Sequence, residues 1–386
     1  MSKDSDKLNL KDNIEIHLKN YEIEKAKELT TLYKDKYGYD DDIAVIEAIL
    51  LILRNNYKEA LDTVREGLKY NIFNSSLYYA MGIAYEFLGS NNRAFLCYEQ
   101  ALNYMKDVDD KEKIINDINR LKSDGDLEVN DYSIILLTYN NLDYTKKCIE
   151  SIRKFANNYE IIVVDNNSTD DTVKWLKEQN DIKYILNSEN KGFPAGCNQG
   201  IKIAKKENDI FLLNNDTVIM PNSIFDLRMG LYSDKRVGAT GSVSNKVSNC
   251  QQIKVKYDDL DGYFKYSLRN NITNESTYEK RFKLVGFAMM IKRKVLDKVG
   301  LLDERFTPGN YEDDDISVRI LLEGYSLLLC KDSYIHHFGS VSFGKNLNSF
   351  WNVLNVNSKK FQQKWGFEAN NFSKEDLLNY INKNEQ

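Results

Sequence analysis

The chain has 386 residues, enough for two or more domains with sizeable hydrophobic cores. Its formal net charge of −5 and the absence of a basic block argue against a nucleic-acid binder, so no nucleic-acid partner is expected. No apolar run is long enough to span a bilayer, the N-terminus has no apolar signal core, and the five cysteines form no Cys-x-x-Cys pair. These features are typical of a cytoplasmic protein with reduced thiols.

Residues 1–122 are predicted to form a helical repeat domain. Three similar helix starts carry Ala26, Ala60 and Ala94, which are 34 residues apart each time, the tetratricopeptide period. Small residues let paired helices approach closely, aromatics fill the gaps, and residues 111–122 have the pattern of a capping helix. The resemblance to a tetratricopeptide array implies a docking groove for a protein segment. A helical spacer or a dimer contact is the alternative.

A polar linker is expected over residues 123–130, and the sequence pattern changes after it. Short buried strands then alternate with helices, which predicts an α/β domain with a Rossmann-like, mostly parallel sheet over residues 131–345. Strands are expected over residues 132–138, 160–165, 182–186, 208–217, 282–291 and 327–335. Residues 245–281 are polar, tyrosine-rich and poorly periodic, and no element is assigned to them.

The strand over residues 208–217 ends in Asn214-Asn215-Asp216-Thr217. In an open α/β sheet, ligands bind beyond the carboxyl ends of the strands, so these polar side chains are expected at a binding site. A lone carboxylate such as Asp216 suits Mg²⁺ or Mn²⁺ shared with substrate phosphates. The alternative is that the four residues only form a turn or cap a helix.

Two further strands are expected to end at the same edge of the sheet. The first closes with Thr138-Tyr139-Asn140 and the second with Asp165. A carboxylate at such a position can accept a hydrogen bond from the ring N–H of uracil or thymine.

A glycine-rich segment, residues 190–200, comes before the strand at 208–217. It brings Gly192 and Gly196 to the start of a helix, where backbone N–H groups favour anionic oxygen. The segment is neither a Walker A loop nor a dinucleotide fingerprint, because the spacing and the place in the chain differ.

Taken together, four segments resemble the family 2 glycosyltransferases, inverting enzymes with the GT-A fold. In chain order they read Leu-Thr-Tyr-Asn, Val-Val-Asp-Asn-Asn-Ser-Thr-Asp, Asn-x-Gly-Phe-x-x-Gly-x-Asn-x-Gly and Leu-Leu-Asn-x-Asp-Thr. The resemblance covers residues 131–345 and implies a nucleoside-diphosphate sugar donor whose base is read by Asp165. Further donor contacts are implied for Thr138, Tyr139, Asn140, Asn167, Gly192, Gly196, Asn198, Asn214 and Asn215. Asn214 stands where the family has the first residue of its Asp-x-Asp metal motif, so Asp216 carries the metal prediction.

Glu312, Asp313, Asp314 and Asp315 form an unusual run of four acids. A helix N-terminus favours one or two of them, and Arg319 stands at i+4 from Asp315. Crowded like charges also raise carboxylate pKa values, which suits a general base. The resemblance to the family's Glu-Asp-x-Asp motif implies Asp313 as the base that takes the proton of the acceptor hydroxyl. It implies that Glu312 orients the acceptor and that Asp315 is structural.

His336 and His337 end the apolar strand over residues 327–335. A histidine at a strand end is often structural. The residues after the pair resemble the family's His-x-Gly-Ser segment, which implies His337 as the metal ligand, with His336 as the fallback. Lys345 is then expected to pair with phosphate, and the metal, Mn²⁺ or Mg²⁺, to neutralise the charge of the leaving diphosphate.

Residues 346–386 are predicted to form two amphipathic helices that pack on the catalytic domain. Their basic face is sparse, so at most a peripheral membrane contact is expected.

The function implied is metal-dependent inverting transfer of a sugar, with UDP-N-acetylglucosamine as the first candidate donor and dTDP-rhamnose as its rival. The repeat domain suggests a protein acceptor, for which the hypothesis is Ser/Thr glycosylation of a bacterial surface or flagellar protein. A rhamnosyl- or other glycosyltransferase of surface polysaccharide assembly is the enzyme alternative. A repeat scaffold with an inactive sugar-binding domain is the alternative from another class.

Overall fold

The computed structural model describes residues 3–339, 347–370 and 372–384. The chain divides into two compact units, a helical unit (Met1–Val129 with Leu268–Asn274) and a sheet unit (Asn130–Ser267 with Glu275–Gln386). The domain boundaries expected from the sequence, at residues 122, 130 and 345, stay predictions.

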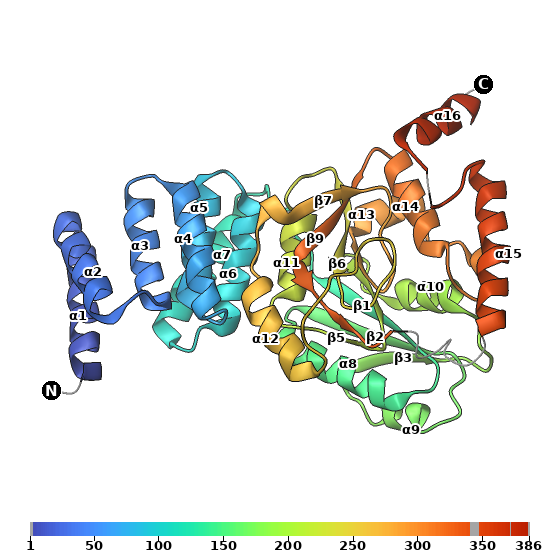
Figure 1. Ribbon diagram of the computed structural model, residues 1–386, viewed down its shortest axis with the longest axis horizontal. Helices are drawn as coiled ribbons and strands as arrows, with labels where there is room; N and C mark the ends of the chain where they lie inside the picture. Colours follow the sequence, from blue (N-terminus) through green and yellow to red (C-terminus); the bar gives the residue numbers. More distant parts are fainter. Residues whose placement is uncertain (1–2, 340–346, 371, 385–386) are drawn as a thin grey trace. The chain divides into compact units, whose positions relative to one another are not determined.

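Seven helices, α1 to α7, make up the described part of the N-terminal segment (Figure 1). They are α1 (Lys3–Lys19), α2 (Ile23–Tyr37), α3 (Asp41–Leu53), α4 (Tyr57–Tyr70), α5 (Ser75–Phe87), α6 (Asn91–Tyr104) and α7 (Val108–Ser123). α1 packs on α2, α3 on α4, and α5 on α6. The second helices of these pairs begin at Ile23, Tyr57 and Asn91, so the 34-residue period of the sequence is also a period of the structure.

Small residues allow the paired helices to approach closely. Ala26, Ala60 and Ala94 are all 0% exposed. A Cβ atom added at Gly82 of α5 would lie 2.4 Å from Cε1 of Tyr98 in α6, so the contact requires glycine. The all-helical N-terminal domain is thus confirmed, while its tetratricopeptide character stays a prediction.

Two aromatic contacts recur in the same way, each between a residue just before a helix pair and the last residue of that pair. The ring centroids of Tyr39 and Tyr70 lie 5.6 Å apart, and those of Phe73 and Tyr104 lie 5.3 Å apart. Each member of the second pair follows its counterpart by 34 residues. These contacts therefore repeat along with the helices.

A short segment from much later in the chain belongs to the helical unit. Residues Leu268–Asn274 cluster with the helices, and Nε of Arg65 in α4 donates to the carbonyl oxygen of Thr273 at 3.1 Å. This contact gives a role to part of residues 245–281, for which the sequence predicted no element.

The sheet unit is built on an eight-stranded mixed sheet in the order β3-β2-β1-β4-β8-β6-β9-β7. Its strands are β1 (Tyr132–Thr138), β2 (Tyr159–Asp165), β3 (Ile182–Leu186), β4 (Asp209–Asn214), β6 (Val237–Val243), β7 (Tyr278–Arg281), β8 (Ala288–Ile291) and β9 (Ser326–Tyr334). β1 to β4 are parallel, β8 is antiparallel to both of its neighbours, and β7 is an antiparallel edge strand. The carboxyl ends of β2, β1 and β4 therefore lie at one edge, as predicted.

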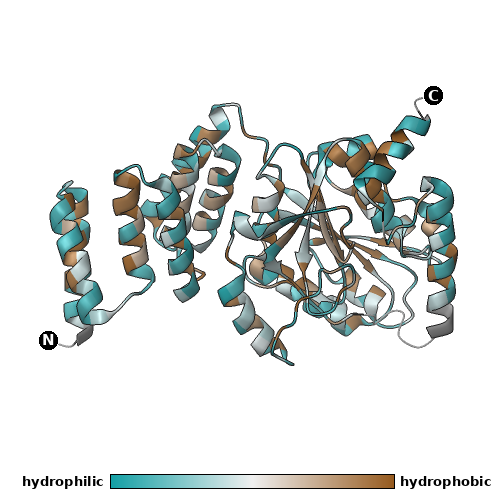
Figure 2. Ribbon diagram, turned by 45° about the horizontal axis from the view of Figure 1, so that its top comes forward, coloured by the Kyte–Doolittle hydropathy of each residue, from teal (hydrophilic) through white to brown (hydrophobic). Residues whose placement is uncertain are grey.

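Helices cover the sheet, and their apolar sides face it. They include α8 (Leu142–Phe155), α9 (Thr172–Lys177), α10 (Phe193–Ile203), α11 (Ser223–Leu231), α12 (Leu260–Asn270), α13 (Arg293–Val299) and α14 (Glu312–Leu322). Figure 2 shows hydrophobic colour along the central strands and helices with two unlike sides. α10 lies close on β1, since a Cβ atom at Gly196 would meet Cδ1 of Leu137 at 2.3 Å and one at Gly200 would meet Cγ2 of Ile135 at 2.8 Å.

The strand predicted over residues 282–291 is shorter than expected. Only Ala288–Ile291 pair as β8, while β7 ends at Arg281. The backbone N–H of Leu284 donates to Oγ of Ser317 and that of Gly286 to Oδ2 of Asp313, both in α14. Because side chains of a helix take these donors, the segment has no strand partner there.

Two helices follow the sheet: α15 (Leu347–Trp365) and α16 (Lys374–Asn384). Phe361, Trp365 and Leu377 form a buried cluster with Phe306 and Val318, the latter in α14. These helices pack on the sheet unit. In the part of the chain that the structure describes, none of the helices combines the length and apolar character needed to cross a membrane.

Candidate active site

Asp216 and His337 meet beside the carboxyl end of β4. Two short strands, β5 (Thr217–Val218) and β10 (His336–His337), pair antiparallel with His337 opposite Thr217. The N–H of Phe338 donates to the carbonyl oxygen of Asp216 at 3.0 Å. This register brings Nε2 of His337 to 3.1 Å from Oδ1 of Asp216, with both residues buried.

The other imidazole nitrogen of His337 fixes the ring's orientation. Nδ1 lies 2.7 Å from the carbonyl oxygen of Lys246, and because a carbonyl only accepts, Nδ1 carries the hydrogen. The Phe287 ring stacks on the imidazole with centroids 5.2 Å apart. Nε2 therefore faces a carboxylate oxygen of Asp216, an arrangement that needs a cation or a proton between the two atoms.

The separation of the two atoms fits a divalent metal. Neighbouring ligands of an octahedral ion with bonds of about 2.1 Å lie about 3 Å apart. The Oδ1 to Nε2 distance of 3.1 Å matches that geometry. Among the described residues no group of three His, Cys, Asp or Glu side chains forms a metal site, so substrate or water oxygens would supply the remaining ligands.

His336, the fallback ligand, has different surroundings. Its ring lies 4.4 Å from that of Tyr263 and 4.7 Å from that of Phe338. Burial, and then the neighbouring charge of His337, lower the pKa of His336 to about 4. An imidazole within an aromatic cluster suits packing, so the geometry favours His337 over His336 as the ligand.

Asp165 closes β2, and one oxygen of its buried carboxylate is unpartnered among the described residues. The residue is 0% exposed, and its Oδ2 accepts from the backbone N–H of Ser168 at 2.9 Å. Within the described residues its Oδ1 has no hydrogen-bond partner. A buried acceptor of this kind is costly unless a ligand supplies a donor.

The loops that follow β1 and β2 are bonded to one another around Asp165. The N–H of Asn140 donates to Oγ of Ser168 at 2.7 Å, and Oδ1 of Asn140 accepts from the N–H of Thr169 at 2.7 Å. Asn140 and Asn167 have left-handed backbones, with φ of 56° and 69°. These contacts hold the end of β2 in place. Tyr139 beside them is 40% exposed and open to a ligand.

Thr138 and Asn215, predicted as donor contacts, bond instead to the protein. Nδ2 of Asn215 lies 2.9 Å from Oγ1 of Thr145 and 3.3 Å from Oγ1 of Thr138. The two threonine hydroxyls are 3.1 Å apart. This network ties the turn before Asp216 to α8, and the donor contacts expected of Thr138 and Asn215 stay predictions.

The glycine-rich segment has a packing role that the sequence interpretation missed. The N–H of Gly192 donates to Oδ1 of Asn190 at 2.9 Å, and that of Gly196 to the carbonyl oxygen of Gly192 at 3.1 Å. Both N–H groups are therefore bonded within the protein and not open to an anion, while a donor contact through other atoms of Gly192 and Gly196 stays a prediction. Gly192 (φ +82°) instead allows a close approach to Thr307, whose Cγ2 would lie 2.8 Å from a Cβ atom, and Gly196 lets α10 lie on β1.

Asn198 is likewise fully used inside the protein. Its Nδ2 donates to the carbonyl oxygen of Leu302 at 2.8 Å and to Oε1 of Glu304 at 3.0 Å, and its Oδ1 accepts from the N–H of Leu302 at 3.0 Å. It braces α10 against the segment before the acidic helix, and the donor contact expected of Asn198 stays a prediction. Lys345, the expected phosphate partner, lies outside the described residues.

The acidic run forms the first turn of α14, which begins at Glu312. Oδ2 of Asp313 accepts from the N–H of Gly286 at 3.0 Å, and Oδ1 accepts from the N–H of Asp314 at 3.0 Å. Burial raises the pKa of Asp313. Burial, followed by the charge of Asp313, raises the pKa of Glu312, whose Oε2 has no partner among the described residues.

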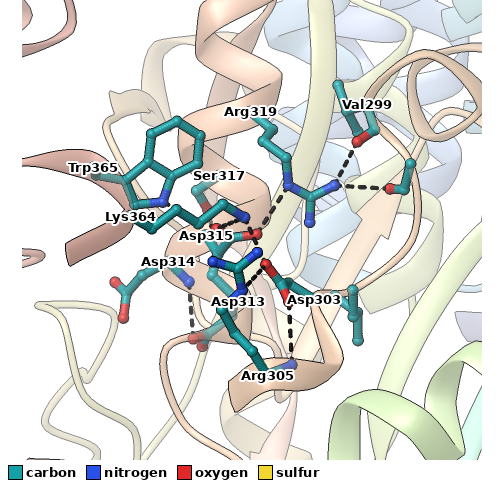
Figure 3. A network of polar contacts seen from close by, with 12 residues as sticks. Val299, Asp303, Arg305, Asp313, Asp314, Asp315, Ser317, Arg319, Lys364 and Trp365 are labelled. Atoms are coloured by element: carbon teal, nitrogen blue, oxygen red, sulfur yellow. Dashed lines mark hydrogen bonds and ion pairs between the residues drawn. The ribbon is translucent and has the colours of Figure 1, made fainter. Parts of the chain in front are cut away.

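Asp315 is a structural residue, as the sequence indicated. It is 0% exposed, and its Oδ2 accepts from Nε of Arg319 at 2.9 Å (Figure 3). Its Oδ1 accepts from Nε1 of Trp365 at 3.0 Å and pairs with Nζ of Lys364 at 2.5 Å. The C-terminal helix α15 thereby locks the acidic turn. Asp314 pairs with Lys283, whose Nζ lies 3.2 Å from Oδ1.

Two adjacent residues link the acidic turn to the Asp216–His337 pair. Gly286 donates to Asp313, and the next residue, Phe287, stacks on His337. The carbonyl oxygen of Phe287 also accepts from the N–H of Asn214 at the end of β4. The candidate base and the candidate metal ligand therefore rest against one short segment.

Comparison with known proteins identifies this part of the chain. Residues 133–300 match the family model described as "Glycosyl transferase family 2". This region is therefore similar to a glycosyltransferase family 2 domain. Together with the helix-flanked mixed sheet, this match confirms the predicted GT-A fold of the sheet unit.

Several relatives are glycosyltransferases by name. The low-salt glycan biosynthesis hexosyltransferase Agl10 of Haloferax volcanii is 26% identical over 210 residues, covering 53% of this chain and 66% of the relative. Poly-beta-1,6-N-acetyl-D-glucosamine synthase of Staphylococcus aureus is 26% identical over 52% of this chain and 48% of the relative. The chain spans less than two thirds of the length of each. The solved mannosyltransferase PcManGT of Pyrobaculum calidifontis, in complex with GDP-Man and Mn²⁺, aligns at TM-score 0.44 and 17% identity, over 61% of this chain and 64% of that one.

The sequence interpretation missed two contributors to the site. Asn166 is 1% exposed, and its Nδ2 donates to Oδ1 of Asn190 and to the carbonyl oxygen of Gly192, each at 3.2 Å. Lys246 contacts Nδ1 of His337 through its backbone carbonyl, so its residue type could not have indicated this role in the sequence. Asn166 could have been found from its place directly after Asp165.

Proposed function

We propose that the protein is a metal-dependent inverting glycosyltransferase that moves a sugar from a nucleoside-diphosphate sugar to a hydroxyl group. The observation that carries the proposal is the pairing of Asp216 with His337 at 3.1 Å, at the sheet edge where the open oxygen of Asp165 also lies. Parallel α/β sheets bind ligands beyond this edge.

Asp165 is the proposed reader of the donor's base. Its unpartnered Oδ1 would accept the ring N–H of uracil or thymine, while Ser168 keeps Oδ2 in place. Both bases offer that donor, so UDP-N-acetylglucosamine and dTDP-rhamnose remain the two candidate donors. The N-acetylglucosamine named in one relative supports testing UDP-N-acetylglucosamine first.

Asp216 and His337 are the proposed ligands of Mn²⁺ or Mg²⁺. When bound, such an ion neutralises the charge that develops on the leaving diphosphate. The protein's own contribution is to hold Oδ1 and Nε2 at a fixed separation and to keep Nδ1 bonded to Lys246.

Asp313 is the proposed general base of a single displacement. The acceptor oxygen forms a bond to the anomeric carbon, the bond from that carbon to the diphosphate breaks, and the hydroxyl proton passes to Asp313. The N–H groups of Gly286 and Asp314 hold the carboxylate, whose remaining lone pairs can accept that proton. Its raised pKa suits this role, and the open oxygen of Glu312 is the proposed contact that orients the acceptor.

For the acceptor, we propose a Ser/Thr hydroxyl of a protein held by the helical unit. The two relatives named above are described by glycan products, which supports a growing glycan as the second candidate acceptor. The buried Asp216–His337 pair and the unpartnered buried oxygens of Asp165 and Glu312 among the described residues favour a catalytic site over a non-catalytic scaffold.

A donor-consumption assay tests the proposal. The full chain with Mn²⁺ is incubated with UDP-N-acetylglucosamine, dTDP-rhamnose and related donors, and released nucleotide is measured by chromatography. We expect slow release from one donor that EDTA and Asp216→Asn both abolish. If no donor is bound or consumed, the enzyme proposal is wrong.

A further inference from the structure

Residues 243–246, at the end of β6 and just after it, are bonded to residues 335–339. The strand that pairs with β10 is β5, so this contact is a separate one. The N–H of Ile335 donates to the carbonyl oxygen of Val243 at 3.1 Å, and Oγ of Ser244 donates to the carbonyl oxygen of Ile335 at 2.7 Å. The first residues after β6 thus follow the chain that leads to His337.

Asn245 then bonds to His337 with its side chain. Its Oδ1 accepts from the backbone N–H of His337 at 3.0 Å, and its Nδ2 lies 3.2 Å from the carbonyl oxygen of His337. One side-chain amide thereby satisfies both backbone groups of this residue, as a neighbouring strand would. Oδ1 is also 3.3 Å from the hydroxyl of Tyr334, which limits how far the amide can turn.

The next residue, Lys246, contacts the imidazole and the chain beyond it. Its carbonyl oxygen accepts from Nδ1 of His337 at 2.7 Å, and its Nζ lies 3.2 Å from the carbonyl oxygen of Phe338. Gly339 (φ +73°) makes room for the lysine stem, because a Cβ atom there would lie 2.6 Å from Cδ of Lys246. Asn245 and Lys246 are consecutive, so fixing the backbone of Asn245 also fixes the carbonyl that orients the ring.

We propose that Asn245 is a positioning residue for the cation site. It holds the backbone of His337 and aligns the Lys246 carbonyl with Nδ1, so that Nε2 stays directed at Asp216. The inference rests on the proposed function, because it takes Asp216 and His337 as the cation ligands. Groups that orient a metal-binding histidine through its second nitrogen commonly change metal affinity by about 10–100-fold when they are lost.

The test measures Mn²⁺ affinity directly, by electron paramagnetic resonance titration of the full-length protein without substrate. We expect Asn245→Ala to weaken Mn²⁺ binding by about 10–100-fold. Asn245→Ser, a second small variant, covers the case in which the alanine variant does not fold. Asn208→Ala is the matched control, because this asparagine is buried and its Nδ2 donates to Oγ of Ser133 at 3.1 Å, just before the start of β4 and thus at the opposite end of that strand from Asp216. It should bind Mn²⁺ like the wild type.

Turnover supplies a second measurement. With Mn²⁺ at saturation, Asn245→Ala should recover most of the wild-type turnover, since Asp313 and Asp165 are untouched. If Asn245 were only structural, Asn245→Ala would either bind Mn²⁺ as tightly as the wild type or fail to regain turnover at saturating Mn²⁺.

The possible results separate the two proposals. If the wild type binds Mn²⁺ and consumes a donor, but folded Asn245 variants bind Mn²⁺ equally well, the positioning role is overturned and the proposed function stands. If the variants bind Mn²⁺ more weakly and no donor is consumed by any of the proteins, the positioning role stands and the proposed function fails. A wild type that binds no Mn²⁺ overturns the positioning role.

Discussion

Oδ1 of Asp216 lies 3.1 Å from Nε2 of His337, although 121 residues separate them in the chain. The two-residue ribbon of β5 and β10 makes this possible, since it sets His337 opposite Thr217, the residue next to Asp216. We propose this buried carboxylate and imidazole nitrogen as cation ligands, and replacing one of them is the most direct test of the site.

His337→Ala should abolish tight Mn²⁺ binding and lower turnover by about 100-fold or more at fixed Mn²⁺, because removal of a ligand costs at least as much as removal of the group that orients it. His336→Phe is the matched control. His336 packs among Tyr263 and Phe338, so an aromatic replacement keeps its contacts. Titration with Mn²⁺ and donor turnover check both variants. If only His336→Phe loses Mn²⁺ binding, His336 is the metal ligand and His337 is not.

Asp165→Asn should weaken UDP binding by about 10–100-fold, since a hydrogen bond to a charged group is worth about 1.5–3 kcal/mol. The asparagine oxygen can still accept from Ser168, so the loop is kept. Asp170→Asn is the control on the same loop, because Asp170 bonds to the N–H groups of Leu142 and Thr172. Calorimetric titration with UDP and dTDP measures the effect, and equal affinities in both variants would remove Asp165 from the base site.

Asp313→Asn should lower turnover by about 10²–10⁴-fold while nucleotide affinity changes little, as expected for loss of a general base. The comparison is Asp314→Asn in the same helical turn, which should retain most turnover. Because burial raises the pKa of Asp313, wild-type turnover should fall as pH drops through that pKa and the base becomes protonated. Turnover that is unchanged in Asp313→Asn would show that another group takes the proton.

Asp314 should make the fold less stable as pH rises. Burial, and then the charge of Asp313, raise its pKa to about 7 despite the nearby Lys283. The folded protein therefore binds more protons than the unfolded chain above pH 4, so stability is fully present in acid and is lost as pH rises to about 7. Relative to the wild type, Asp314→Asn should gain at least 1 kcal/mol more at pH 8 than at pH 5, since each pKa unit is worth about 1.4 kcal/mol. Urea denaturation at the two pH values measures this, and a gain that is equal at both would contradict the sign.

Trp365→Phe should lower the free energy of unfolding by about 1–3 kcal/mol, because it removes a donor from the buried carboxylate of Asp315. Trp351→Phe in the same helix is the matched control. Trp351 is 59% exposed, whereas Trp365 is 5% exposed, so the control should stay within about 0.5 kcal/mol of the wild type. Denaturant unfolding of both variants decides whether α15 stabilises the acidic turn through this contact.

The parallel half of the sheet could be predicted because each of its strands is a short apolar run followed by polar residues. The other four strands were predicted less well, since β9 was expected, β8 was expected to be longer, and β6 and β7 were not expected. The backbone N–H groups of Leu284 and Gly286 donate to side chains of α14. These long-range hydrogen bonds leave no signal in the local sequence pattern. β6 contains Gly238 and Gly241, which weaken the strand pattern, and it was not predicted.

The same distinction holds at the site. The i, i+4 pairing of Asp315 with Arg319 is local and was predicted from spacing alone. The role of Asn198 depends on Leu302, 104 residues away, and the N–H of Gly192 is already bonded to Oδ1 of Asn190. Sequence patterns indicate which residues are chemically able to act, but the partners that occupy them are set by the tertiary fold.

The segment Leu268–Asn274 belongs to the helical unit, which matters for any experiment that separates the two units. A cut in the stretch around residue 129 does not yield two self-sufficient pieces, since the helices would lose the segment that Arg65 holds through Thr273. Chimeras between relatives should therefore exchange the helices and residues Leu268–Asn274 together. A fragment that ends at residue 129 should be made only with a separate peptide that supplies this segment.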